Sequence, residues 1–91
     1  MASLADKIKA GAKIVDVRTP EEFNEEAYPN AVNIPVDEMA SRISEFGDKN
    51  APLIVYCASG ARSAYAARML KNAGYVDVVN AGGLYDMPEV G

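Results

Sequence analysis

The chain has 91 residues, 49% of them hydrophobic, and a net charge of -4 at pH 7, so it is long enough for one small domain and is not expected to be disordered. Its 9 lysine and arginine residues form no basic cluster, which argues against nucleic acid or an anionic membrane as a partner. One cysteine and no histidine exclude an internal disulfide, a Cys-His or Ser-His-Asp catalytic set and a zinc site, and we expect no metal or other cofactor.

The first part of the chain is predicted to form a helix, a strand and a second helix. Apolar residues at helical spacing predict a helix over residues 4–10, which Gly11 ends. The β-branched run in residues 13–17 is typical of a strand that is buried on both faces. Thr19 then begins a short helix, with Glu22 placed to complete a capping box.

The middle of the chain is predicted to contain a short strand and an amphipathic helix. Residues 31–34 favour a strand, which Pro35 ends. Four apolar side chains then recur at spacings of three, four and three, as they do on one face of a helix: Val36, Met39, Ile43 and Phe46. We therefore expect a helix over residues 36–46, ended by Gly47, whose apolar face lies in the core.

The last part of the chain continues the alternation of strands and helices. Residues 53–56 are predicted to form a strand that leads into Cys57, and residues 63–73 a helix rich in alanine. Residues 76–79 are predicted to form a last strand, followed by a glycine-containing turn. This order predicts a small three-layer α/β domain with a mainly parallel central sheet flanked by helices, with residues 1–91 forming a single domain.

Two features bear on where the protein works. No apolar run approaches the roughly eighteen residues that a membrane span needs. The first residues lack the basic segment and apolar stretch of an export signal. We therefore expect a cytoplasmic protein.

Cys57 is the residue most suggestive of chemistry, because it lies where a predicted strand meets a loop that opens onto a helix. The backbone N–H groups of such a loop, together with the helix dipole, lower the pKa of a thiol. Gly60 permits the tight backbone that the loop requires, and the cation of Arg62 at the start of the helix calls for an anionic partner. The alternative is that the cysteine is a small, inert core residue.

Four segments in order are similar to the signatures of the rhodanese-like (sulfurtransferase) domain: Ile14–Arg18 followed by Pro20–Phe23, then Pro29–Pro35, Val55–Ser63 and Gly82-Gly83. The resemblance implies a rhodanese-like fold and a cysteine that takes a sulfane sulfur from thiosulfate, polysulfide or a persulfide donor. Cys57 would hold that sulfur as a persulfide and pass it to cyanide or a thiol. It further implies small-molecule donors and acceptors, with a thioredoxin-like or other thiol protein among the acceptors.

The loop residues have candidate roles with plain structural alternatives. The amides of Ala58, Ser59, Gly60 and Ala61, with Arg62 and Ser63, are expected to cradle the persulfide. Arg62 either holds the anionic end of a donor or pairs with an acidic residue to brace the loop. Asp16 is a candidate partner for that brace, and Arg18 and Glu22 are candidates to join the network. Ser63 is expected to cap the following helix. A turn with positive φ is the simplest reason for Gly82-Gly83.

Two other functions remain open. One is a non-catalytic rhodanese-like module that contacts proteins, in which the thiol of Cys57 titrates near the ordinary value of about 8.5. The other is a phosphatase or arsenate reductase of related fold, whose loop is one residue longer than the four residues that separate Cys57 from Arg62. The short loop favours sulfur transfer.

Overall fold

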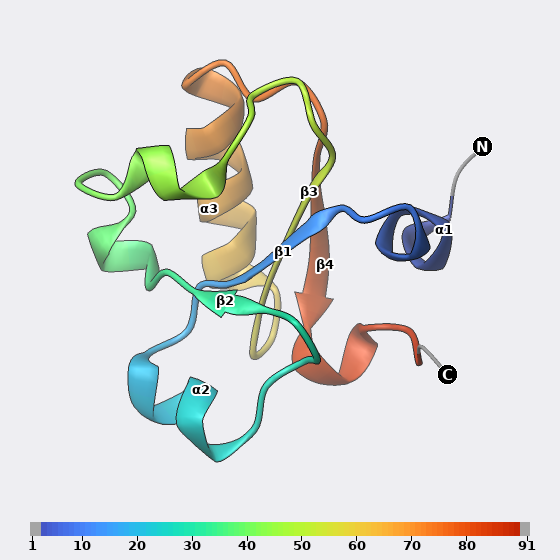
Figure 1. Cartoon of the computed structure of the whole chain (residues 1–91). Coiled ribbons are helices and arrows are strands. Elements are labelled where there is room, and N and C mark those ends of the chain that lie inside the picture. The colour runs from blue at the N-terminus through green and yellow to red at the C-terminus, as the bar shows by residue number, and fades with distance from the viewer. Residues whose placement is uncertain (1–2, 90–91) are drawn as a thin grey trace.

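The computed structural model describes residues 3–89 and arranges them around a four-stranded sheet (Figure 1). The elements follow one another as α1 (Leu4–Lys9), β1 (Lys13–Asp16), α2 (Pro20–Glu25), β2 (Val32–Asn33), the 3₁₀ turns η1 (Val36–Glu38) and η2 (Ile43–Phe46), β3 (Leu53–Cys57), α3 (Ala61–Asn72), β4 (Val78–Gly83) and the 3₁₀ turn η3 (Leu84–Asp86). The strand order is β2-β1-β3-β4 and every neighbouring pair is parallel. The prediction of a parallel α/β sheet is confirmed.

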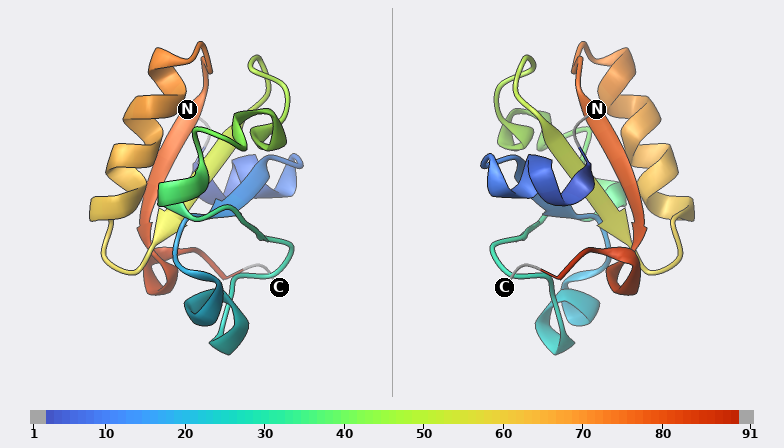
Figure 2. Two further views of the ribbon diagram at one scale, coloured as in Figure 1. Left: turned by 90° about the vertical axis from the view of Figure 1, so that its left-hand side faces the viewer. Right: turned by 90° about the vertical axis from the view of Figure 1, so that its right-hand side faces the viewer.

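Two apolar layers cover the two faces of the sheet, because side chains alternate along each strand. On β3, Leu53, Val55 and Cys57 point to the face covered by α3 and the two 3₁₀ turns η1 and η2. Ile54 and Tyr56 point to the opposite face, which is covered by α1 and η3. Figure 2 shows α3 and α1 on opposite sides of the strands. These layers give the three-layer arrangement expected from the alternation of elements.

The predicted capping box at the start of α2 is present. The backbone N–H of Glu22 donates to Thr19 Oγ1 at 3.3 Å, and the N–H of Thr19 donates to Glu22 Oε1 at 3.1 Å. The box uses one carboxylate oxygen of Glu22 and so orients that side chain by local contacts alone.

Within residues 3–89, no helix is long and apolar enough to cross a membrane.

The prediction of a helix over residues 36–46 is wrong, since the segment forms two short 3₁₀ turns. Pro35 provides no side-chain cap, and the Ser41 hydroxyl donates to the carbonyl of Glu38 at 3.0 Å, a bond that competes with helix formation. The apolar spacing still has its expected effect on burial: Met39 and Phe46 are fully buried, and Val36 and Ile43 pack against them.

The last strand lies further along the chain than predicted. β4 starts at Val78, which pairs with Leu53, and it ends at Gly83, which pairs with Cys57. Val76 precedes the paired region and is 70% exposed. The predicted turn at residues 81–83 is therefore part of an irregular strand end that runs alongside the cysteine.

Candidate active site

Cys57 lies at the carboxyl end of β3, an interior strand of the sheet, where the chain turns into α3. Its side chain is fully buried, whereas Ala58 and Ser59, the next two residues, are exposed. In parallel sheets, ligands bind at the edge where the carboxyl ends of the strands meet. The thiol therefore lies just below the surface of the edge where a substrate is expected.

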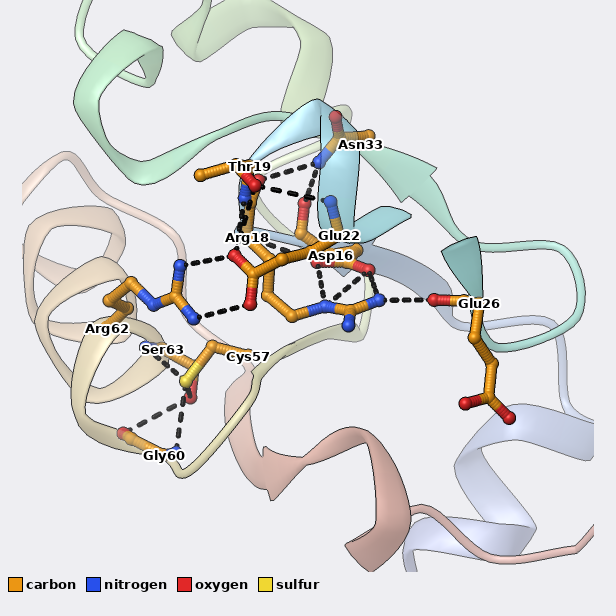
Figure 3. Close-up of polar contacts among 10 residues, drawn as sticks. All are labelled: Asp16, Arg18, Thr19, Glu22, Glu26, Asn33, Cys57, Gly60, Arg62 and Ser63. Atoms are coloured by element: carbon orange, nitrogen blue, oxygen red, sulfur yellow. Dashed lines mark hydrogen bonds and ion pairs between the residues drawn. The ribbon is translucent and has the colours of Figure 1, made fainter. Parts of the chain in front are cut away.

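Two backbone donors and one hydroxyl group surround the sulfur (Figure 3). The backbone N–H of Gly60 donates to Cys57 Sγ at 3.0 Å, and the N–H of Ser63 donates at 3.4 Å. The Ser63 hydroxyl lies 3.3 Å from the same sulfur. Gly60 has a φ of +101°, the left-handed conformation that turns its N–H back toward the cysteine.

The environment favours the thiolate of Cys57. Burial alone raises the pKa of the thiol, but hydrogen bonds from the Ser63 hydroxyl and from the amides of Ser63, Gly60 and Ser59 outweigh burial, and the net pKa is lowered. A buried cysteine among hydrocarbon side chains would show the opposite direction. This arrangement can stabilise an ionised sulfur without a neighbouring base.

The prediction that Ser63 caps the helix is wrong. α3 begins two residues earlier than expected, at Ala61, and Gly60 occupies the capping position without any side-chain hydrogen bond. Ser63 lies within the first turn, is fully buried and contacts the sulfur. The early start follows from the left-handed Gly60, which ends the loop after only three residues beyond the strand.

Arg62 pairs with Glu22, not with Asp16. The Nη1 and Nη2 atoms of Arg62 lie 2.8 Å and 3.1 Å from the two carboxylate oxygens of Glu22 (Figure 3). Hydrogen bonds from Arg62 and from the Thr19 backbone lower the pKa of Glu22 to about 2. This bidentate pair ties the start of α3 to the start of α2, so the bracing role of Arg62 is present.

Asp16 pairs with Arg18 at the end of β1. Arg18 Nη2 lies 2.6 Å from Asp16 Oδ2, and the same nitrogen donates to the Glu26 carbonyl at 2.6 Å. Asp16 is fully buried and Arg18 is 7% exposed, and the guanidinium lies 5.6 Å from the centre of the Tyr56 ring. The pair therefore fastens the end of the sheet to the end of α2 and makes no contact with the sulfur.

Gly82 and Gly83 are glycines for two different reasons. Gly82 has a φ of +92°, as expected for a turn that needs glycine. Gly83 has an ordinary φ of -94°, but a Cβ on it would lie only 2.2 Å from the carbonyl oxygen of Ala58. β4 can run this close to the cysteine loop only because residue 83 has no side chain.

Asn80 is a site residue that we did not predict. Its side chain reaches from β4 to the start of α3, where Oδ1 lies 2.6 Å from the Ser63 hydroxyl. The signal that could have found it is a polar residue directly after the apolar pair Val78-Val79, two residues before Gly82-Gly83 in a strand parallel to β3.

Nothing among residues 3–89 gathers three potential metal-binding side chains of the His, Cys, Asp and Glu types. The sulfur of Cys57 has only nitrogen and hydroxyl donors around it. The amide donors suit a hydrogen-bonded thiolate.

Comparison with known proteins gives consistent matches. The family described as "Rhodanese-like domain" matches residues 1–86. Thiosulfate sulfurtransferase PspE of Escherichia coli (strain K12) is 44% identical over 79 residues, which cover 84% of this chain and 76% of that protein. Thiosulfate sulfurtransferase GlpE of Pseudomonas syringae is 35% identical over 77 residues, 85% of this chain and 72% of that protein. A solved structure described as "rhodanese with anions from E. coli" has a TM-score of 0.79 and 42% identity, covering 88% of this chain and 98% of that one.

Proposed function

We propose that this chain, which belongs to the rhodanese-like domain family and is a rhodanese-type sulfurtransferase, transfers sulfane sulfur through a persulfide on Cys57. The donor is thiosulfate, a polysulfide or another persulfide, and the acceptor is a thiophile such as cyanide or a thiol. The observation that carries the proposal is the convergence of the Gly60 and Ser63 amides on Cys57 Sγ.

The first half of the reaction needs a thiolate and a good leaving group but no general base. The Cys57 thiolate attacks the outer sulfur of thiosulfate, a new S–S bond forms, and the old S–S bond breaks with its electron pair leaving on sulfite. The negative charge then lies on the outer sulfur of the persulfide. No proton is transferred, which suits a chain without histidine.

The second half returns the enzyme to its starting state. The acceptor attacks the outer sulfur, and the S–S bond breaks with its electron pair returning to Cys57 Sγ. With cyanide as the acceptor the product is thiocyanate. The outer sulfur lies about 2 Å beyond Sγ, as in any S–S bond, and we propose that the amides of residues 58–63 stabilise its charge as an oxyanion hole does.

The roles of the charged residues follow from their contacts. Because both of its terminal nitrogens are engaged by Glu22, we propose that Arg62 chiefly braces the loop. Its side chain is 36% exposed, so attraction of an anionic donor stays a prediction. Asp16 and Arg18 support the site indirectly, because their contacts join the end of β1 to the Glu26 carbonyl after α2.

Mass measurement of the intact protein tests the proposal. After incubation with thiosulfate or polysulfide, the protein should gain one sulfur atom and lose it on treatment with cyanide. The matched control is Cys57→Ser, which removes the only thiol of the chain and should gain nothing. If the wild-type protein gains no sulfur from any member of the donor panel, the proposed mechanism is wrong.

The two other functions predict different results in simple assays. In a non-catalytic module, the rate of alkylation of Cys57 would titrate near the ordinary thiol value of about 8.5. A phosphatase or arsenate reductase would turn over a phosphate ester or arsenate. The lowered pKa of Cys57 argues against the non-catalytic module. The short loop and the thiosulfate sulfurtransferases among the relatives favour sulfur transfer over phosphatase or arsenate reductase chemistry.

We also propose that the partners are small sulfur donors and thiol acceptors, a thiol protein of the thioredoxin type among them. A reducing setting such as the cytoplasm would suit this chemistry, because the carrier thiol must be reduced to accept sulfur.

A further inference from the structure

The hydroxyl group of Ser63 has one hydrogen but four neighbours that can accept it. Asn80 Oδ1 lies at 2.6 Å, the Gly60 carbonyl at 3.2 Å and the Gly82 carbonyl at 3.4 Å. The fourth neighbour is Cys57 Sγ at 3.3 Å. Since a hydroxyl has a single O–H to donate, only one of these acceptors is served well at a time.

The amide of Asn80 is oriented so that its oxygen, not its nitrogen, faces Ser63. Oδ1 accepts the backbone N–H of Gly82 at 3.0 Å, and Nδ2 donates to the Gly60 carbonyl at 3.3 Å. Exchanging the oxygen and nitrogen would place a donor against the Gly82 N–H and an acceptor against the Gly60 carbonyl. The two backbone partners therefore fix the Asn80 oxygen, an acceptor, as the nearest of the four neighbours of the hydroxyl.

The best partner of that hydrogen depends on the state of Cys57. With a neutral thiol, the hydroxyl donates to Asn80 Oδ1, and the S–H can donate to the Ser63 oxygen in turn. With a thiolate, the sulfur needs the hydrogen, because hydrogen bonds to charged atoms are the strong ones. We propose that Asn80 is a positioning residue that competes with the Cys57 thiolate for the single hydroxyl hydrogen of Ser63.

The competition has a consequence for sulfur transfer, and this consequence alone rests on the proposed function. When Sγ forms a bond to a sulfane sulfur, its negative charge moves to the outer sulfur. Sγ then no longer needs the hydroxyl hydrogen, which returns to Asn80 at 2.6 Å. Asn80 therefore stabilises the loaded enzyme relative to the free thiolate and keeps the thiolate reactive.

The charged groups around the cysteine come from the elements packed against its loop. Arg62 from α3 acts on Cys57 by its charge and is paired with Glu22 from α2. Asp86 from η3 accepts the Gly83 N–H at 2.8 Å, and the Asp16–Arg18 pair lies at the end of β1. The substitutions below change none of these charged groups. Asn80→Leu also removes the hydrogen bonds to the Gly60 carbonyl and the Gly82 N–H, so the double variant is needed to separate that effect from the hydroxyl hydrogen.

The test replaces Asn80 with leucine, which has nearly the same shape but cannot accept a hydrogen bond. Asn80 is exposed, so the fold should tolerate the change. The pH dependence of alkylation of Cys57 by iodoacetamide is measured in wild type, Asn80→Leu, Ser63→Ala and the double variant. We expect Asn80→Leu to lower the titration midpoint by about one pH unit, the size of one hydrogen bond to a charged group.

The double variant separates competition for the hydrogen from a general structural effect. In the Ser63→Ala background there is no hydroxyl hydrogen, so Asn80→Leu should leave the midpoint unchanged. An equal shift in both backgrounds, no shift in either, or a rise of the midpoint in the single variant would overturn the proposal.

A measurement on the wild-type protein covers the case in which a variant fails to fold. The NMR signals of the Asn80 side-chain amide and the Gly82 amide should titrate with the Cys57 midpoint and stop titrating once the thiol is alkylated. Signals that stay constant across the midpoint, or that titrate equally in Ser63→Ala, contradict the competition. These readouts need no sulfur donor, so failure of sulfur loading would refute the proposed function and leave this inference standing.

Discussion

Replacing Gly83 in β4 with alanine should displace the adjacent loop that follows Cys57. Gly83 pairs with Cys57 at the end of β4, and its φ of -94° is open to any residue, so the substitution adds no backbone strain. The added Cβ, however, would lie 2.2 Å from the carbonyl oxygen of Ala58 and 3.0 Å from its carbonyl carbon. The perturbation is therefore a steric contact with the first residue of the loop.

The size of the effect follows from that contact. Because real Cβ atoms almost never come closer than 3.0 Å, the Ala58 peptide or β4 must move by about 0.8 Å or more. Overpacking of this kind costs about 1–3 kcal/mol of stability. A displacement near 1 Å at a reacting group costs about a hundredfold in rate. We expect Gly83→Ala to lose about 1–3 kcal/mol of stability and to load sulfur on Cys57 about a hundredfold more slowly.

Urea unfolding and a time course of sulfur loading measure the two effects. Gly11→Ala is the control for a Cβ added without a steric contact: Gly11, unlike Gly83, has a left-handed φ of +96°, but a Cβ there meets nothing within 4 Å. That control should lose about 1–2 kcal/mol from left-handed strain and load sulfur at the wild-type rate. If Gly83→Ala loads as fast as wild type and is no less stable than Gly11→Ala, the close approach does not constrain the loop.

Three further predictions concern the core and the two ion pairs. Met39→Ala should lower the free energy of unfolding by about 2–5 kcal/mol in urea, because Met39 is fully buried; an effect as small as that of the exposed Val76→Ala would contradict its place in the core. Arg18→Met should cost about 3–5 kcal/mol by leaving the buried Asp16 carboxylate unpaired, and adding Asp16→Leu should recover most of the loss in the same unfolding assay. The Glu22 carboxyl has a lowered pKa of about 2 in the folded protein. Its pairing with Arg62 therefore stabilises the fold fully at pH values above 4.5, the ordinary pKa, and the stabilisation is lost as the pH falls toward 2. The stability difference between wild type and Glu22→Gln, below about 1 kcal/mol for so exposed a pair, should shrink across that window; a difference independent of pH would show that the pair contributes nothing.

Local signals predicted several parts of the molecule correctly. The capping box depends on Thr19 and Glu22, which are three residues apart, and both of its hydrogen bonds are present. The strand before Cys57 was predicted from an apolar run, and β3 ends at that cysteine. A tight loop after a strand directs its amides inward over a few residues, so the donors on the sulfur were predictable as well.

Contacts between distant segments decided the rest. Arg62 could have paired with any carboxylate near the sheet edge, and only the approach of α2 to α3 selects Glu22, forty residues away. Spacing alone could place Met39 and Phe46 in the core but could not decide whether the backbone between them is helical.

Short-range patterns alone determined that this protein is a parallel α/β domain with a cysteine at a strand end, because periodicity, caps and glycines act over a few residues. The surroundings of the Ser63 hydroxyl depend on Asn80, seventeen residues away on another strand, and a linear pattern does not say which side chains of different elements will meet. Tertiary packing alone therefore decided which groups share the hydrogen beside the sulfur.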